Sequence, residues 1–120
     1  MKKVYIISRY RAKTKRQQDF NTVVAQFFAR ETVLSGKMPI VPHIYFTQFL
    51  DDEDKDEREC GLGLGIHALR QCDEFLLVVI DGIISEGMRA EIEELSRLGI
   101  PGRIITLTRK EFIQRVKKAR

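Results

Sequence analysis

The sequence predicts an α/β protein with a parallel sheet, and three observations support this. Short β-branched runs alternate with longer amphipathic segments along the whole chain, an order typical of parallel strands joined by right-handed crossovers. The run FLLVVI at 75–80 is apolar on both faces, as a central strand covered by helices on both sides must be. The length of 120 residues suits one domain with a real core. We therefore expect a single domain over 1–120, a flavodoxin-like or Rossmann-like three-layer sandwich with strand order 2-1-3-4.

The first half of the chain is predicted to hold two strands and two helices. Apolar side chains recur at helical spacing before Gly36, which indicates a long amphipathic helix that stops there. The elements in order are a strand over 2–8, a polar loop over 9–14, a helix over 15–35, a strand over 38–42, an aromatic connection over 43–50 and a helix over 54–71. Gly61, Gly63 and Gly65 fall inside that last helix, where we interpret them as allowing close packing on a neighbour rather than as a dinucleotide fingerprint.

The second half is predicted to hold the central strand, a last strand and two more helices. Its elements in order are a strand over 75–80, a loop over 81–84, a short helix over 85–99, a strand over 103–107 and a basic terminal helix. Ser85 is a typical helix cap, and Gly99 ahead of Pro101 is a typical helix stop.

Glu91 is the most informative residue of the helix at 85–99. On a helical wheel counted from Met88, the apolar arc runs from about 280° at Leu98 to about 40° at Ile92, and Glu91 falls inside it at about 300°. The other charged residues fall mostly on the opposite side, and these are Glu93, Glu94 and Arg97. An ionised carboxylate on a core-facing stripe is costly unless it is paired, hydrogen-bonded or lining a pocket. Glu91 is therefore either a nucleophile in a pocket or a partner of an arginine such as Arg9, Arg11 or Arg58.

Other candidate residues lie where a doubly wound sheet binds ligands, outside the carboxyl ends of the first and third strands. Ser85 and Gly87 open a helix, so their N–H groups favour an anion such as phosphate, although Ser85 also reads as an ordinary cap. Tyr10 is a candidate to bond the nucleophile or to stack on a base, and Arg11 to clamp a phosphate. For each of these two residues, an ordinary position on the protein surface is an equally good explanation.

Two further candidates at this crevice have ordinary structural alternatives. His43 follows Pro42 and either reaches the crevice or packs within its loop. Asp81 is a candidate proton donor or ligand for a leaving base, and its alternative role is to form a turn.

Composition excludes several classes of function. Two cysteines and two histidines show no zinc-type spacing, so we expect no metal. The apolar runs are too short to span a bilayer and the N-terminus lacks a signal peptide, so we expect a cytoplasmic protein. The net charge of +4 gathers at Lys13 to Arg16 and at the C-terminus without any nucleic-acid-binding motif, so solvated helix ends explain it better than nucleic acid.

Several short motifs together resemble the nucleoside 2-deoxyribosyltransferase superfamily, in particular its small, functionally uncharacterised bacterial and phage members. The resemblance covers Lys3 to about Thr108. Its most specific elements are Pro-Ile-Val-Pro-His at 39–43 and Ser-x-Gly-Met-x-x-Glu-Ile at 85–92, and supporting ones are Ser8-x-Tyr10-Arg11, Asn21, Arg58-Glu59-x-Gly61-Leu62 and Cys72-Asp73-Glu74.

The resemblance implies roles for individual residues. Glu91 would attack C1′ of a 2′-deoxynucleoside or its 5′-monophosphate, Ser85 would contact the 5′-phosphate, and Tyr10 or Tyr5 would orient the nucleophile. Serine stands where transferase members place an aspartate near the base, which favours phosphate or a different ligand over free-base exchange. Arg9 stands where close relatives carry proline. The resemblance also implies a homodimer or larger homo-oligomer with sites near its interfaces.

We thus expect an enzyme that cleaves or transfers the N-glycosidic bond of a nucleoside or nucleotide without a metal or redox cofactor. Its expected catalytic residues are Glu91, Tyr10 and Asp81. Its expected substrate-binding residues are Ser8, Arg9, Arg11, His43, Ser85, Gly87 and Met88. The alternative is a non-catalytic module that senses or sequesters a nucleotide-like ligand, with Glu91 bonding ribose hydroxyls.

Overall fold

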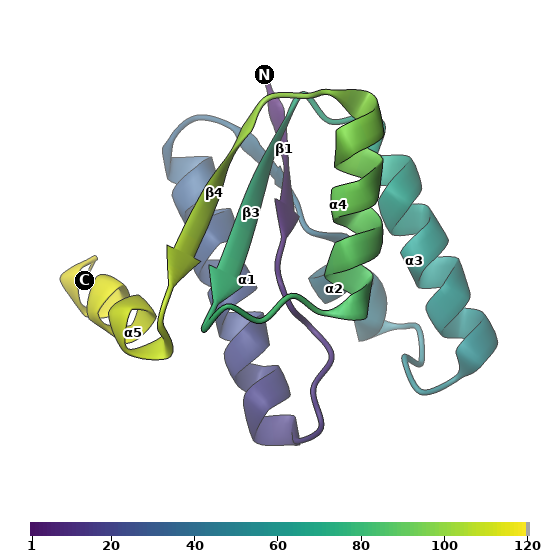
Figure 1. Cartoon of the computed structure of the whole chain (residues 1–120), viewed down its shortest axis with the longest axis horizontal. Helices are drawn as coiled ribbons and strands as arrows, with labels where there is room; N and C mark the ends of the chain where they lie inside the picture. Colours follow the sequence, from purple (N-terminus) through teal and green to yellow (C-terminus); the bar gives the residue numbers. More distant parts are fainter. Residues whose placement is uncertain (120) are drawn as a thin grey trace.

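The computed structural model describes residues 1–119, which fold around a four-stranded parallel sheet in the order β2-β1-β3-β4 (Figure 1). The strands are β1 (Lys3–Ile7), β2 (Met38–Ile40), β3 (Glu74–Ile80) and β4 (Gly102–Leu107). In this register Tyr5 of β1 lies between Ile40 of β2 and Phe75 of β3. The predicted strand order is confirmed, and the switch point of the sheet lies between β1 and β3.

Helices connect and cover the strands. They are α1 (Lys15–Leu34), α2 (Pro42–Tyr45), the 3-10 turn η1 (Phe46–Gln48), α3 (Lys55–Leu69), α4 (Glu86–Leu98) and α5 (Arg109–Lys118). The sequence predicted a strand through Pro42 followed by an aromatic connection, but β2 ends at Ile40. Pro42 starts α2 because its fixed φ suits a first helical turn. In the part of the chain described, no helix has the length and apolar character needed to cross a membrane.

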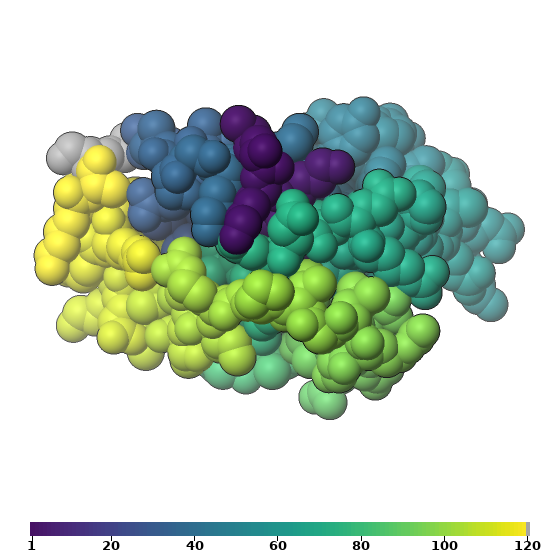
Figure 2. Space-filling model, turned by 90° about the horizontal axis from the view of Figure 1, so that it is seen from above, coloured from purple at the N-terminus to yellow at the C-terminus, as the bar shows by residue number. Residues whose placement is uncertain are grey.

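Alternation along β1 divides the core into two layers. Tyr5 and Ile7 face a cluster formed with α3 and α4, whereas Val4 and Ile6 face a cluster formed with α1 and α5. β3 is buried on both faces, as its unbroken apolar run predicts. Seen from the amino ends of the strands, the N-terminus lies mid-surface and the C-terminal helix at one end (Figure 2).

Helix α4 begins and ends as its sequence predicts, but one of its charges lies elsewhere. Ser85 accepts a hydrogen bond from the Met88 N–H, and Gly99 ends the helix with a φ of 66°. The expectation that Glu94 lies on the exposed face is wrong. Glu94 is only 6% exposed because it lies beside the apolar arc, where Arg70 Nε at 2.7 Å and Arg97 Nη1 at 2.9 Å donate to its carboxylate.

Candidate functional site

A cavity of about 540 Å³ opens beyond the carboxyl end of β1. Its walls come from the β1–α1 loop, α2 and η1, the first turns of α3 and the first two turns of α4. This is the place where a doubly wound sheet is expected to bind its ligand. Its size is that of a small-molecule site.

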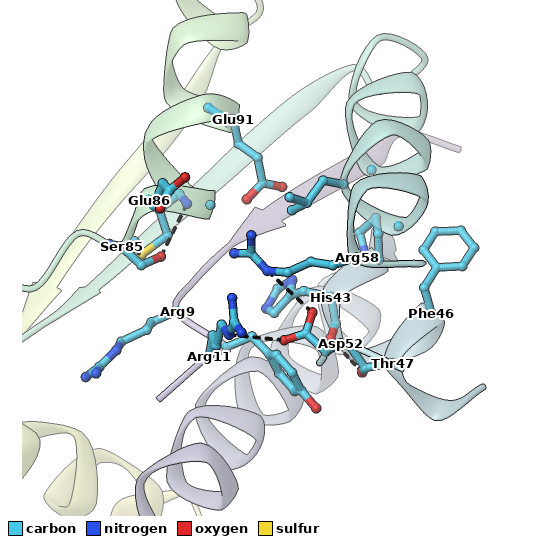
Figure 3. Close-up of a pocket in the computed structure, with 18 of the residues that line it drawn as sticks. Arg9, Arg11, His43, Phe46, Thr47, Asp52, Arg58, Ser85, Glu86 and Glu91 are labelled. Atoms are coloured by element: carbon cyan, nitrogen blue, oxygen red, sulfur yellow. Dashed lines mark hydrogen bonds and ion pairs between the residues drawn. The ribbon is translucent and has the colours of Figure 1, made fainter. Parts of the chain in front are cut away.

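Glu91 points into this cavity from α4, as Figure 3 shows. Its carboxylate accepts a hydrogen bond from the Tyr5 hydroxyl, which comes from the middle of β1. Burial raises the pKa of Glu91 to about 7, and the bond from Tyr5 acts against this rise. The same burial, together with the facing carboxylate, raises the pKa of Tyr5, so the phenol stays a donor.

Glu91 is not the arginine-paired core residue that its sequence position also allowed. Within residues 1–119, no cation lies within 4 Å of its carboxylate. Arg58 pairs with Asp52 instead, and Arg11 pairs with Asp52 and Glu53. A partly buried carboxylate with one neutral donor is characteristic of a functional site.

The structure separates the other two predicted catalytic residues from Glu91. Tyr10 lines the cavity, but its hydroxyl accepts from Gln18 Nε2 at 3.4 Å. Tyr5 therefore holds the position beside the carboxylate that either tyrosine was predicted to fill. Asp81 lies outside this cavity, at a φ of 55° in a turn, where it accepts the Arg109 N–H at 2.9 Å. It lines a separate cavity of about 40 Å³.

Ser8 and His43 form a buried pair in the cavity wall. His43 Nε2 lies 2.8 Å from Ser8 Oγ, and burial lowers the pKa of His43 to about 4, so the ring is neutral at pH 7. His43 Nδ1 is buried without a hydrogen-bond partner among residues 1–119. Because no third group orients the ring, the pair lacks the arrangement that activates a serine nucleophile.

The start of α4 forms another part of the wall. Ser85, Gly87 and Met88 all line the cavity, as predicted. Ser85 Oγ accepts the Met88 N–H at 3.3 Å, which leaves its own hydrogen free to donate to a ligand. Met88 is only 1% exposed and belongs mainly to the core between the sheet and α3.

Charged side chains surround the opening. The Arg9 side chain lines the cavity and extends away from Glu91 in Figure 3. Arg11 Nε lies 3.7 Å from Asp52 Oδ2, and Arg58 Nε lies 3.8 Å from Asp52 Oδ1. From the sequence, Arg58 was expected only as a possible ion-pair partner of Glu91, and Asp52 had no expected role. Helical spacing could have predicted that Arg58 faces the site. Positions 58, 61, 62 and 65 share one face of α3, and all of them line the cavity.

Gly65 makes room for the pair of Tyr5 and Glu91. A Cβ at Gly65 would lie 3.1 Å from the Tyr5 hydroxyl oxygen, which is tighter than an ordinary contact. Among residues 1–119, no atom beyond the neighbouring residues and the backbone of α3 itself lies within 4 Å of such a Cβ at Gly63. Close packing therefore explains Gly65 but not Gly63. No group of three or more metal-ligating side chains gathers in the described part of the chain.

The family profile "Domain of unknown function (DUF7768)" matches residues 2–105. The chain belongs to the DUF7768 family. No curated protein matches this DUF7768 member.

Among solved structures, this DUF7768 chain is similar to the 2-deoxyribosyltransferase of the psychrotolerant bacterium Bacillus psychrosaccharolyticus. The TM-score is 0.64 at 15% identity, over 87% of this chain and 72% of that one. The similarity shows that the two proteins share a fold, which is the fold the resemblance implied.

Proposed function

We propose that this protein cleaves or transfers the N-glycosidic bond of a deoxynucleoside or its 5′-monophosphate, with Glu91 as nucleophile. The observation that carries the proposal is the cavity-facing carboxylate of Glu91, which accepts a hydrogen bond from the Tyr5 hydroxyl and has no cation within 4 Å among residues 1–119. The shared fold with a 2-deoxyribosyltransferase supports the same chemistry.

The proposed step is attack of a Glu91 carboxylate oxygen on C1′. The C1′–N bond breaks, its electron pair leaves with the base, and a glycosyl ester of Glu91 forms. A facing carboxylate stabilises the oxocarbenium-like transition state, and water or a second base then releases the sugar. The Tyr5 hydroxyl fixes the direction of the carboxylate and favours its ionised form.

The start of α4 is the proposed place for a phosphate or a sugar hydroxyl. N–H groups at a helix start point outwards with the positive end of the helix dipole behind them. Ser85 adds a hydroxyl donor, and Gly87 leaves the backbone open to the ligand. Glu91 lies on the second turn of the same helix, so the ligand's anionic end and its anomeric carbon would meet one element.

A panel assay tests the proposal. Purified protein is incubated with deoxynucleosides, ribonucleosides and their 5′-monophosphates, with and without a second base, and released base is measured by chromatography. We expect base release that disappears in Glu91→Ala while the circular dichroism spectrum is kept. Full activity in Glu91→Ala would exclude Glu91 as nucleophile. Tight binding of an unaltered nucleotide would instead support the sensing or sequestering module.

A further inference from the structure

The Arg58 guanidinium has hydrogen-bond donors that no group in residues 1–119 accepts. The Arg58 side chain lines the cavity, is 23% exposed and makes no hydrogen bond within residues 1–119. Its partner within 4 Å is Asp52, at 3.8 Å from Nε, which is beyond hydrogen-bond length. A guanidinium presents five N–H donors in a rigid fork, so these donors are available to a ligand.

Arg58 and Glu91 reach the same space from different helices. Arg58 comes from the first turn of α3 and Glu91 from the second turn of α4, and Figure 3 shows both side chains directed into the cavity. No ion pair within 4 Å joins them in the described chain, so they do not neutralise each other. A ligand attacked by Glu91 therefore lies within reach of a cationic donor on another wall.

The proposed reaction needs such a donor at the departing base. When C1′–N breaks, the base carries away the electron pair and becomes an anion unless an acid protonates it. Asp81, the acid predicted for this role, lies outside the cavity. A guanidinium does not release a proton at neutral pH, but it stabilises an anion through charge-assisted hydrogen bonds.

We propose that Arg58 is a catalytic residue that binds the departing base, and that the preferred substrates carry a base that leaves as an anion, such as uracil. This inference rests on the proposed function. Arg58 donates N–H bonds to the base while Glu91 bonds to C1′, and water later protonates the released anion. Adenine, which departs well only after protonation of a ring nitrogen, is a poor leaving group at this site.

Leaving-group dependence tests this role directly. The kcat/KM values are measured for 2′-deoxyuridine, 5-fluoro-2′-deoxyuridine and their 5′-monophosphates. Fluorine withdraws electrons, so the fluorinated base needs less help to leave. We expect Arg58→Met to lower kcat/KM about 100-fold for the uracil substrate and about 10-fold for the fluorinated one. Arg11→Met is the matched control, because Arg11 also pairs with Asp52 but its side chain is 47% exposed. We expect this variant to lower kcat/KM by the same factor for both substrates.

The outcomes separate this inference from the proposed function. If wild-type protein releases base but Arg58→Met slows both substrates by the same factor, Arg58 does not act on the leaving group and the inference fails alone. If wild-type protein releases no base from any substrate, the proposed function fails and the inference with it. Should Arg58→Met not fold by circular dichroism, Arg58→Lys decides, because it keeps the charge, loses the fork and should still steepen the leaving-group dependence.

Discussion

Glu91 and Glu94 lie one turn apart on α4, yet their surroundings shift their pKa values in opposite directions. Glu94 accepts hydrogen bonds from Arg70 and Arg97, and the bond from Arg70 together with the charges of both guanidinium groups lowers its pKa. Glu91 accepts one from Tyr5 and faces a cavity, and burial raises its pKa from 4.5 to about 7. The carboxylate of Glu94 holds α3 against α4, whereas the carboxyl of Glu91 faces the cavity and has no cationic partner within 4 Å in the described chain. The two carboxyls therefore differ in their hydrogen-bond partners: two guanidinium groups for Glu94 and one phenol for Glu91.

The two carboxyls also contribute to stability in opposite pH ranges. The folded pKa of Glu91 lies above its ordinary value, so its contribution is present at acid pH and is lost as the pH rises towards 7. The folded pKa of Glu94 is lowered, so its contribution is present above the ordinary carboxyl pKa and is lost as the pH falls through the lowered value.

Exchanging each glutamate for glutamine gives the largest expected contrast. Glu91→Gln should lower kcat/KM by at least about 10³-fold, because an amide is no nucleophile, and should leave the unfolding temperature unchanged or raised at pH 8. Glu94→Gln should lower the unfolding temperature, because two guanidinium groups lose their carboxylate, and should keep kcat/KM within about threefold. Base release and thermal unfolding are measured for both. The comparison breaks if the two variants lose activity equally.

The pH dependence of the reaction sharpens the comparison further. Because Glu91 must be ionised to attack, kcat/KM should rise with pH up to about 7 and fall about tenfold per pH unit below it. Tyr5→Phe removes the bond that opposes the raised pKa, so the midpoint of this profile should move to higher pH, with about a tenfold loss of rate at pH 7. Glu94→Gln supplies the control, since its profile should match that of wild type. An acid limb that stays in place in Tyr5→Phe would separate Tyr5 from the nucleophile.

The smallest expected effect comes from the glycine behind the pair. Gly65→Ala places a Cβ 3.1 Å from the Tyr5 hydroxyl oxygen, so Tyr5 must shift against Glu91 and kcat/KM should fall about three- to tenfold. Gly63→Ala places its Cβ away from every other element of the described chain, so it should keep the activity and raise stability through better helix propensity. Steady-state kinetics and thermal unfolding are measured for the two variants and compared. Equal kinetics would show that Tyr5 tolerates the added methyl group.

The fold followed from sequence because its signals are local. Individual elements are indicated by the unbroken apolar strand at 75–80, by capped helices and by the regular alternation of strands and helices. The rule of right-handed crossovers then leaves few possible strand orders. The short helix at Pro42–Tyr45 was missed because four residues carry no helical period.

The site was predictable where a residue broke a local rule. Glu91 was found because a carboxylate stands in an apolar arc. Tyr5 reads as an ordinary strand aromatic, so nothing in β1 alone puts it ahead of Tyr10 as the partner of Glu91. Glu94 was misplaced because a wheel contains no information about Arg70, which belongs to the end of another helix. Contacts between distant segments decided the positions of Tyr5 and Glu94, which the local sequence could not show.

The bond between Tyr5 and Glu91 joins positions 86 apart in the chain, and this separation has a consequence during synthesis. While the first 80 residues emerge from the ribosome, strands β1 to β3 can pair, but the phenol of Tyr5 still has no carboxylate beside it. Only when α4 has left the exit tunnel does the reactive pair exist. Nascent chains shorter than this length would therefore lack the proposed nucleophile, and the appearance of activity would report that α4 has packed against β1.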